Sequence, residues 1–483
     1  MTEVAVVPGK AANRDVDERT VERLRTRPLL GGVLVSDCAG RFMLAETSLA
    51  DRLHRSAFNP GDVELLQAQG LIPRDRLGRL ALVYARERRR LISNKLDYLI
   101  LVPTLRCNLA CSYCQVSRAG LDTIGFDWSD ETLKAVLARV AALDVKSVKI
   151  EFQGGEPTLR PDLIAAVIDA VPAGVEARFV ICTNLQAVDD RLLSLFDRDD
   201  VSISTSLDGP LPIHARQRHG EMSMAKSFLD NVRMLIARYG PDKISALPTI
   251  DPLAPPDADT LIESYAELGF TSVFLRPVNY QGFARKRYPV SRNNSPDWLA
   301  YHRAFVDRLI ERNWEDRSQV FEESYFSLLL RRIFRPGEDR HVDLRNPNPV
   351  GHDCIVMDFD GRVYPTDEAR MLTRSGIIDL AIGDVHSGWD TPARAALDSV
   401  STNDGDPACE ACTYQPYCGR DIIDDIARYG RIDVPRLETD FCRRHLSLFD
   451  HAFELIHSTD PAVQYSLRRW LGLAGETGAL VVR

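Results

Sequence analysis

Short apolar runs alternate with amphipathic stretches from Leu96 onward, and this alternation predicts the main fold of the chain. Apolar runs that predict strands cover residues 96–102, 148–152, 179–182, 201–207, 244–250 and 273–275. Apolar residues at helical spacing predict helices over residues 133–140, 163–171, 192–196, 228–239 and 261–268. Ser129 can cap the first of these helices. Six strand–helix units predict an α/β fold, a partial (βα)6 barrel whose functional residues lie at the carboxyl ends of parallel strands.

The segments outside this alternation predict further regions. Residues 31–44 alternate as a β-hairpin does, and an arginine-rich helical stretch follows to about residue 94. Residues 295–335 also have helical spacing. We expect an N-terminal region that contacts a peptide or covers the sheet, then the barrel, a helical bridge, a cysteine-rich domain and a C-terminal tail. The expected boundaries are 1–95, 96–315, 316–352, 353–450 and 451–483.

Three cysteines with CxxxCxxC spacing follow the first strand of the predicted barrel. They are Cys107, Cys111 and Cys114. Three thiolates on one short loop can hold three irons of a [4Fe–4S] cube, which leaves the fourth iron open to another ligand. A structural zinc site is the alternative, but zinc sites favour CxxC pairs and a fourth ligand that closes the site. The spacing therefore favours a cluster with one open iron.

Residues 102–114 resemble the signature of the radical S-adenosylmethionine (SAM) enzymes, including the aromatic Tyr113 before the third cysteine. In that family SAM binds the open iron through its amino and carboxylate groups. The resemblance implies a SAM-binding [4Fe–4S] cluster on the three cysteines, and reductive cleavage of SAM to a 5′-deoxyadenosyl radical. The cofactors supply the difficult chemistry, while the protein binds, orients and excludes water.

Glycine and polar residues follow the next strands where that family binds SAM. With Tyr113, the candidate cofactor-binding residues are Gly154, Gly155, Glu156, Pro157, Asn184, Ser206, Asp208 and Arg218. The resemblance implies that the Gly-Gly-Glu-Pro motif binds the SAM amino group, and that the region of Ser206 and Asp208 lies beside the ribose and methionine portion. Glycine lets a backbone approach a ligand closely. For each residue taken singly, an ordinary polar strand end is the alternative.

A second group of cysteines lies in the C-terminal region. Its members are Cys409, Cys412, Cys418 and Cys442. They resemble the distal-cluster ligands of the SPASM extension of radical SAM peptide maturases, which implies one auxiliary [4Fe–4S] cluster. The proximal cluster of that extension needs cysteines where Thr366 and Ile422 stand, so only Cys354 remains and we expect that cluster to be absent. Four thiolates also suit zinc, and spacing alone does not separate the two.

Asp367 directly follows Thr366. In sulfatase-maturing relatives an aspartate at this place is a proposed proton acceptor, so the resemblance makes Asp367 the candidate catalytic residue. Exposed turn carboxylates are the more frequent explanation for Asp367 and Glu368 together.

Longer matches indicate one system within the peptide maturases. Residues 114–118, 150–157, 179–185, 204–210, 364–371 and 415–419 are similar to the radical SAM maturase of the His-Xaa-Ser peptide system. The resemblance implies C–H abstraction and crosslink formation on a ribosomally made precursor peptide with His-Xaa-Ser repeats. A second radical SAM protein and an electron donor such as a flavodoxin or ferredoxin are the other implied partners. The alternatives are another maturase, such as a sulfatase-type oxidase or thioether former, and a non-catalytic metal-bound peptide-binding protein.

Charge and composition narrow the partners and the compartment. The net charge of −9 argues against a nucleic-acid backbone as partner. No run of about 18 apolar residues occurs, so we expect no membrane span. The N-terminus lacks the features of a signal peptide. We therefore expect a cytoplasmic protein, where ten cysteines are more plausible as metal ligands or free thiols than as disulfides.

Overall fold

An eight-stranded sheet forms the centre of the computed structural model, which describes residues 24–89, 95–116, 118–293, 295–335 and 344–481. Five parallel strands are neighbours in chain order: β4 (Tyr98–Thr104), β5 (Ser147–Gly154), β6 (Glu176–Cys182), β7 (Val201–Ser206) and β8 (Ile244–Leu247). Ile150 of β5 lies between Leu99 of β4 and Phe179 of β6, and all three side chains are buried. The predicted α/β fold with a partly open parallel sheet is confirmed.

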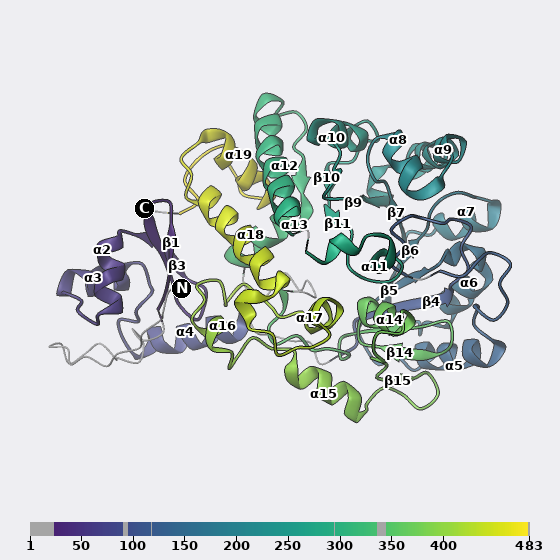
Figure 1. The fold of residues 1–483 in the computed structure, drawn as a ribbon, viewed down its shortest axis with the longest axis horizontal. Helices are drawn as coiled ribbons and strands as arrows, with labels where there is room; N and C mark the ends of the chain where they lie inside the picture. Colours follow the sequence, from purple (N-terminus) through teal and green to yellow (C-terminus); the bar gives the residue numbers. More distant parts are fainter. Residues whose placement is uncertain (1–23, 90–94, 117, 294, 336–343, 482–483) are drawn as a thin grey trace.

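Helices cover the apolar face of these strands. They are α5 (Asp130–Ala141), α6 (Pro161–Ala170), α7 (Asp190–Phe196), α9 (Met222–Tyr239) and α10 (Ala258–Ala266). Figure 1 shows α5, α6 and α7 side by side along the outside of the sheet. Ser129 caps α5 as predicted, because its hydroxyl accepts a hydrogen bond from the Thr132 amide at 3.0 Å.

The strand predicted at 244–250 is divided, and in place of the one predicted at 273–275 two short strands lie on either side of residues 274–275. Pro248 separates β8 from β9 (Thr249–Ile250), since proline has no amide hydrogen for the strand ladder. β9 pairs in parallel with β11 (Arg276–Pro277), and β10 (Ser272–Val273) pairs in parallel with β12 (Glu322–Glu323). The wall beyond β8 thus consists of two short strand pairs.

Three strands of the C-terminal region continue the main sheet on its β4 edge, which the sequence analysis did not predict. β13 (Cys354–Met357) pairs in parallel with β4, so that Cys354 lies opposite Tyr98. β14 (Arg362–Tyr364) and β15 (Gly383–Asp384) follow in antiparallel order. All four residues of β13 are buried. The domain boundary expected at residue 353 stays a prediction, and the chain just beyond it shares the sheet of the barrel.

Further helices make up the rest of the C-terminal region. They are α14 (Asp367–Arg374), α15 (Pro392–Val400), α16 (Pro407–Glu410), α17 (Ile422–Tyr429), α18 (Asp440–Ile456) and α19 (Pro461–Trp470). Helix α18 buries Phe441, Leu448, Phe449 and Phe453. No helix in the described part of the chain is long and apolar enough to cross a membrane.

The N-terminal region packs against the C-terminal helices, beside α18 in Figure 1. It contains a sheet of β1 (Arg25–Leu29), β2 (Gly32–Ser36) and β3 (Phe42–Ala45), followed by α2 (Thr47–His54), α3 (Pro60–Ala68) and α4 (Arg76–Arg89). The predicted hairpin is confirmed by the pairing of β2 and β3, and β1 adds a third strand. Arg27 pairs with Asp450, and the ring of Phe42 lies 4.9 Å from that of Phe453.

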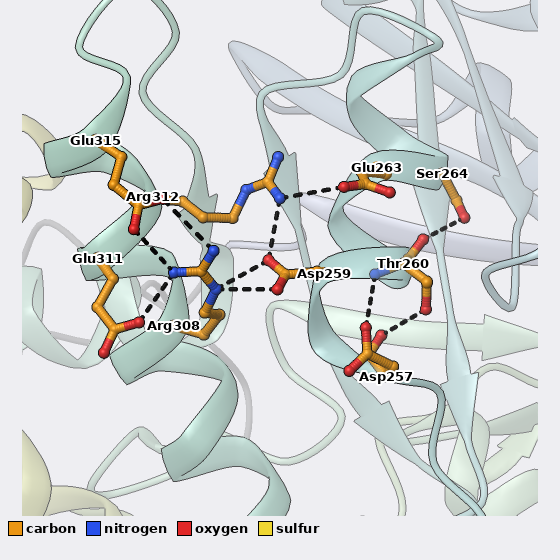
Figure 2. A network of polar contacts seen from close by, with 9 residues as sticks. All are labelled: Asp257, Asp259, Thr260, Glu263, Ser264, Arg308, Glu311, Arg312 and Glu315. Carbon is orange, nitrogen blue, oxygen red and sulfur yellow. Dashed lines mark hydrogen bonds and ion pairs between the residues drawn. The ribbon is translucent and has the colours of Figure 1, made fainter.

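Two helices account for the predicted helical region at 295–335: α12 (Ser295–Glu315) and α13 (Ser324–Phe334). Arg308 and Arg312 of α12 reach Asp259 of α10, and further carboxylates surround the pair of guanidinium groups (Figure 2). Exposed pairs of this kind contribute little stability singly. In these pairs the carboxylates neutralise cations at the surface of the protein.

Candidate functional site

The three-cysteine loop begins after β4, at the carboxyl end of the sheet. Cys107 Sγ accepts a hydrogen bond from the Leu109 amide at 3.4 Å, and the Asn184 side-chain nitrogen lies 3.9 Å from the same sulfur. Burial raises the pKa of Cys107 to about 12 and also raises the pKa of Cys111. These two thiols are therefore neutral near pH 7, and the positive charge of bound iron would stabilise them as thiolates. Donors aimed at sulfur fit an iron–sulfur cluster.

Gly154 and Gly155 bring the turn after β5 against the stem of this loop. A Cβ at Gly155 would lie 2.3 Å from the carbonyl oxygens of Leu105 and Arg106. Gly154 has a φ of 153°, and a Cβ there would lie 2.2 Å from the Thr104 oxygen. The close approach that these glycines permit is thus to residues 104–106, beside the cysteines. Their contact with SAM stays a prediction.

Glu156 joins the ends of two strands. Its buried carboxylate accepts hydrogen bonds from the Thr158 hydroxyl at 2.6 Å and from the Asn184 amide at 2.7 Å. Burial raises the pKa of Glu156. Asn184 also donates to the Asn108 side chain at 2.7 Å, inside the cysteine loop. Glu156 and Asn184 therefore order the surroundings of Cys107, and their predicted contacts with SAM remain untested.

Tyr113, Asp208 and Arg218 form one buried network, although about a hundred residues separate the first from the others. The Tyr113 hydroxyl donates to the Asp208 carboxylate at 2.7 Å, and Arg218 donates to the Tyr113 oxygen at 2.6 Å. The Thr249 amide donates to Asp208 at 3.0 Å. Burial raises the pKa of Asp208, and burial also raises the pKa of the Tyr113 hydroxyl. Ser206, also predicted, lies half-buried at the end of β7.

A polar cluster on the β5 strand was missed by the sequence analysis. Glu151 accepts hydrogen bonds from Tyr98 at 2.6 Å and from Gln153 at 2.6 Å, and it pairs with Lys149 at 3.0 Å. The Cys182 thiol donates to it at 3.3 Å. Burial opposes ionisation, but Lys149 and Tyr98 hold the pKa of Glu151 below its usual value. Polar residues at every second position of an otherwise apolar strand were the available signal, since they share the face away from the helices.

The four C-terminal cysteines line one cavity. Burial raises the pKa of Cys409 to about 12 and that of Cys442 to about 11. Arg436 lines the same cavity, pairs with Asp425 at 2.6 Å, and has an Nε without a hydrogen-bond partner among the described residues. A buried cation with a free donor suits the negative charge of a tetrathiolate group. The donor types of the set therefore suit a bound metal group, although the four sulfurs are not gathered closely enough in the described structure to hold a single ion.

The positions that would carry the proximal cluster have structural roles. The Thr366 hydroxyl accepts from the Ala369 amide at 3.1 Å and caps α14, while Ile422 packs in the apolar cluster between α14 and α17. Cys354 is buried at the start of β13. Among the described residues, no three His, Cys, Asp or Glu side chains are gathered closely enough to hold a single metal ion. The number of auxiliary clusters stays a prediction.

Asp367 begins α14 and is paired with a buried guanidinium. Arg370 donates to it from Nε at 2.7 Å, and Arg370 also lies 3.7 Å from the buried Asp358. Asp367 is thus engaged by the Arg370 side chain. The catalytic role of Asp367 remains a prediction.

Comparison with known proteins agrees with this geometry. Residues 101–270 match the model of the radical SAM superfamily. A segment of 136 residues is 32% identical to the GTP 3′,8-cyclase of Tolumonas auensis, covering 28% of this chain and 39% of that protein. A segment of 106 residues is 32% identical to the PqqA peptide cyclase of Rhodopseudomonas palustris, covering 22% of this chain and 27% of that protein. The matched segments span less than half of either relative.

Two solved structures share the fold over a larger part of the chain. The structure of anSMEcpe with bound AdoMet superposes with a TM-score of 0.58 and 18% identity, covering 74% of this chain and 96% of that one. Streptococcus suis SuiB bound to the precursor peptide SuiA superposes with a TM-score of 0.51 and 13% identity, covering 89% and 100%. The family match lies on the sheet that carries the three-cysteine loop. Residues 101–270 of this chain are therefore similar to the radical SAM superfamily, over the sheet that carries the three-cysteine loop.

Proposed function

We propose that this protein is a radical SAM enzyme that modifies a ribosomally made precursor peptide. The observation that carries the proposal is the three-cysteine loop at the carboxyl end of a parallel sheet, where Tyr113, Asp208 and Arg218 form a buried network around it. Distant segments converge there, as expected for a cofactor site in an α/β fold.

The residues of the chain have separable tasks in this proposal. Cys107, Cys111 and Cys114 hold a [4Fe–4S] cluster, and this cluster with SAM supplies reductive cleavage to a 5′-deoxyadenosyl radical. Asn184 donates toward the Cys107 sulfur and orders the loop. Arg218 adds a buried positive charge beside Cys111, which favours an anionic group at the loop. The buried strand ends around the loop exclude water from the reacting groups.

A peptide substrate is supported by the related proteins. One relative is named a PqqA peptide cyclase, and one solved relative is bound to a precursor peptide. Another relative is named a GTP 3′,8-cyclase, so the radical SAM domain alone does not select the substrate. The motifs around residues 150–157 and 204–210 favour the His-Xaa-Ser peptide system among the peptide maturases, and a sulfatase-type oxidase or thioether former is the second candidate.

We further propose one auxiliary [4Fe–4S] cluster on Cys409, Cys412, Cys418 and Cys442. The spacing of these four cysteines, which resembles that of the distal-cluster ligands of the SPASM extension, supports a cluster over a zinc ion. The competing function is a non-catalytic peptide-binding protein in which both cysteine sets are structural.

Anaerobic reconstitution separates these functions. The protein incubated with SAM and dithionite should form 5′-deoxyadenosine, and the Cys107→Ala/Cys111→Ala/Cys114→Ala variant should form none. Colourless protein that contains zinc and leaves SAM intact would establish the non-catalytic alternative. Mass spectrometry of a precursor with His-Xaa-Ser repeats, coexpressed with the enzyme, then tests the substrate. An unchanged peptide mass beside active SAM cleavage would redirect the search to another peptide.

A further inference from the structure

A strap of residues 278–293 lies across the outer side of the three-cysteine loop. The Phe283 amide donates to the Cys114 carbonyl at 3.0 Å, and Arg287 donates to the Cys111 carbonyl at 3.1 Å. Gly282 has a φ of 53°, and a Cβ there would lie 1.7 Å from the Gln115 carbonyl oxygen. Glycine is therefore required where the strap approaches the loop.

The other side of the strap is attached to the C-terminal helices. Arg285 donates to the Ala427 carbonyl at 2.5 Å. Arg428 of α17 donates to the carbonyls of Ser291 at 3.1 Å and Arg292 at 2.6 Å. The strap is thus held between the cysteine loop and α17, and its side chains are presented in a defined arrangement.

The strap is basic in an acidic protein. Residues 268–296 contain no Asp or Glu, whereas the whole chain has a net charge of −9. Lys286, Arg287 and Arg292 on the strap are exposed, and so is Arg216. Arg216 lies beside the same loop, because the carbonyl of the next residue, Gln217, accepts the Ser112 amide at 2.8 Å. We call Arg216, Lys286, Arg287 and Arg292 the cationic patch.

The cationic patch differs from other arginine-rich parts of the surface. The guanidinium groups on α12 are neutralised by the carboxylates of Asp259, Glu311 and Glu315 (Figure 2). Within the described residues, no member of the cationic patch pairs with a carboxylate, and Arg287 bonds to backbone carbonyls. Unneutralised cations on one face create a local positive potential that attracts acidic partners.

We propose that the cationic patch is the docking surface for an acidic electron-transfer protein, an inference that rests on the proposed function. The cluster must receive an electron from outside, and Arg287 of the patch bonds to the backbone of its ligand Cys111, while Phe283 of the strap bonds to that of Cys114. The net charge of the chain would repel an acidic partner elsewhere, so a local patch is needed for productive encounters. One electron leaves the partner's reduced flavin or iron–sulfur group, which is oxidised, and reduces the three-cysteine cluster. No covalent bond forms or breaks in this step, and no proton is transferred.

The geometry favours this partner over an acidic substrate peptide. The Tyr113 ring packs with Val278 and Ala284 of the strap and its hydroxyl joins the buried network with Asp208 and Arg218, whereas Arg287 is exposed and donates to the Cys111 and Ser112 carbonyls. A substrate peptide must bring a C–H bond to the buried network, whereas the patch is exposed at the backbone of Cys111. Electron transfer at the patch requires proximity and complementary charge, and it requires no proton donor or acceptor.

The test compares two reductants on the variant Lys286→Glu/Arg292→Glu. Among the described residues, neither of these side chains makes a hydrogen bond or an ion pair with the loop. Reduced flavodoxin is the protein reductant and dithionite the chemical one, and 5′-deoxyadenosine formation, iron content and the spectrum of the reduced cluster are measured. We expect kcat/KM for flavodoxin to fall about tenfold or more at low salt, mainly through KM, and the difference to shrink as salt screens it. Dithionite-driven turnover and iron content should stay within about twofold of the wild type, because a small reductant needs no docked protein.

Lys134→Glu/Arg191→Glu is the matched control, since it changes the charge equally on α5 and α7. An equal loss of flavodoxin-driven turnover in this control, or no loss in the patch variant, would overturn the docking site. A raised KM for the precursor peptide with an unchanged KM for flavodoxin would assign the patch to the substrate and also overturn it. If the double variant loses iron, the milder Lys286→Gln/Arg292→Gln must reproduce the selective flavodoxin defect. Absence of dithionite-driven 5′-deoxyadenosine in the wild type would instead refute the proposed function.

Discussion

Tyr113 illustrates how one side chain connects the cysteine loop to the rest of the barrel. Its hydroxyl is both donor to Asp208 and acceptor from Arg218; Tyr113 and Asp208 are buried, and Arg218 is half-buried. Removing one member of a buried network leaves the others without partners, which costs more than the bond itself contributes.

Tyr113→Phe should therefore destabilise the protein by about 1–3 kcal/mol, because it leaves a buried carboxylate and guanidinium short of a partner. Urea unfolding measures this change, and calorimetric titration with SAM should show weaker binding. Tyr239→Phe is the control, since its hydroxyl bonds to the exposed Asp197 at 2.6 Å. Equal unfolding midpoints for the two variants would contradict the role assigned to Tyr113.

Asp358 predicts a pH dependence of stability. Burial raises its pKa to about 6, despite the nearby Arg370. Between about pH 4 and pH 6 the folded state holds a proton that the unfolded state has released, so the stability from this group is present at low pH and is lost as the pH rises.

Asp358→Asn cannot titrate, so its stability relative to the wild type should increase by about 1–1.5 kcal/mol from pH 5 to pH 7.5. Urea unfolding of both proteins at the two pH values measures this. A constant difference would mean that Asp358 is ionised in the folded protein throughout this range.

At the scale of elements, two cysteines of the C-terminal region lie in different environments. Cys412 lines the cavity with three other cysteines, whereas Cys354 lies in β13 and pairs with β4 of the main sheet. A cluster depends on its ligands for assembly, and the fold around it depends on the cluster.

Cys412→Ala should lose about half of an expected eight irons per chain, while Cys354→Ala should keep them all. Iron analysis and circular dichroism of anaerobically prepared variants measure both effects. Equal iron loss in the two variants would make Cys354 a ligand, and about twelve irons in the wild type would reveal a proximal cluster.

At the scale of the whole molecule, the N-terminal sheet is attached to the C-terminal cysteine region. Arg27 bonds to Asp450 from two nitrogens, at 2.5 and 2.6 Å, and the Tyr414 hydroxyl donates to the same carboxylate at 2.7 Å. Tyr414 lines the cavity of the four cysteines. The N-terminal region thus supports one wall of that cavity.

Arg27→Ala should loosen this attachment by about 1 kcal/mol, since the pair is only partly buried. Limited proteolysis should then cleave within the N-terminal region faster than in the wild type. Arg431→Ala removes an exposed pair with Asp433 and is the control. Identical cleavage rates for both variants would show that the Arg27 contact does not hold the two regions together.

The sequence by itself determined the order of strands and helices in the barrel and the candidate ligands. Apolar patterns with periods of 2 and 3.6 residues are local, and the CxxxCxxC spacing lies within eight residues. Both can therefore be recognised in the sequence before the fold is known. Even the division of the strand at Pro248 has a local cause that the sequence contained.

Only the tertiary structure decided which distant residues meet. The pairing of β13 with β4 joins residues more than 250 positions apart, and no local pattern specifies such a partner. The same holds for the contact of Arg287 with the Cys111 carbonyl and for the Tyr113–Asp208–Arg218 network. These contacts depend on the packing of elements around the sheet, where burial makes a polar group's partner essential. Local patterns specified the elements and the ligand types, and packing specified the arrangement of charge around them.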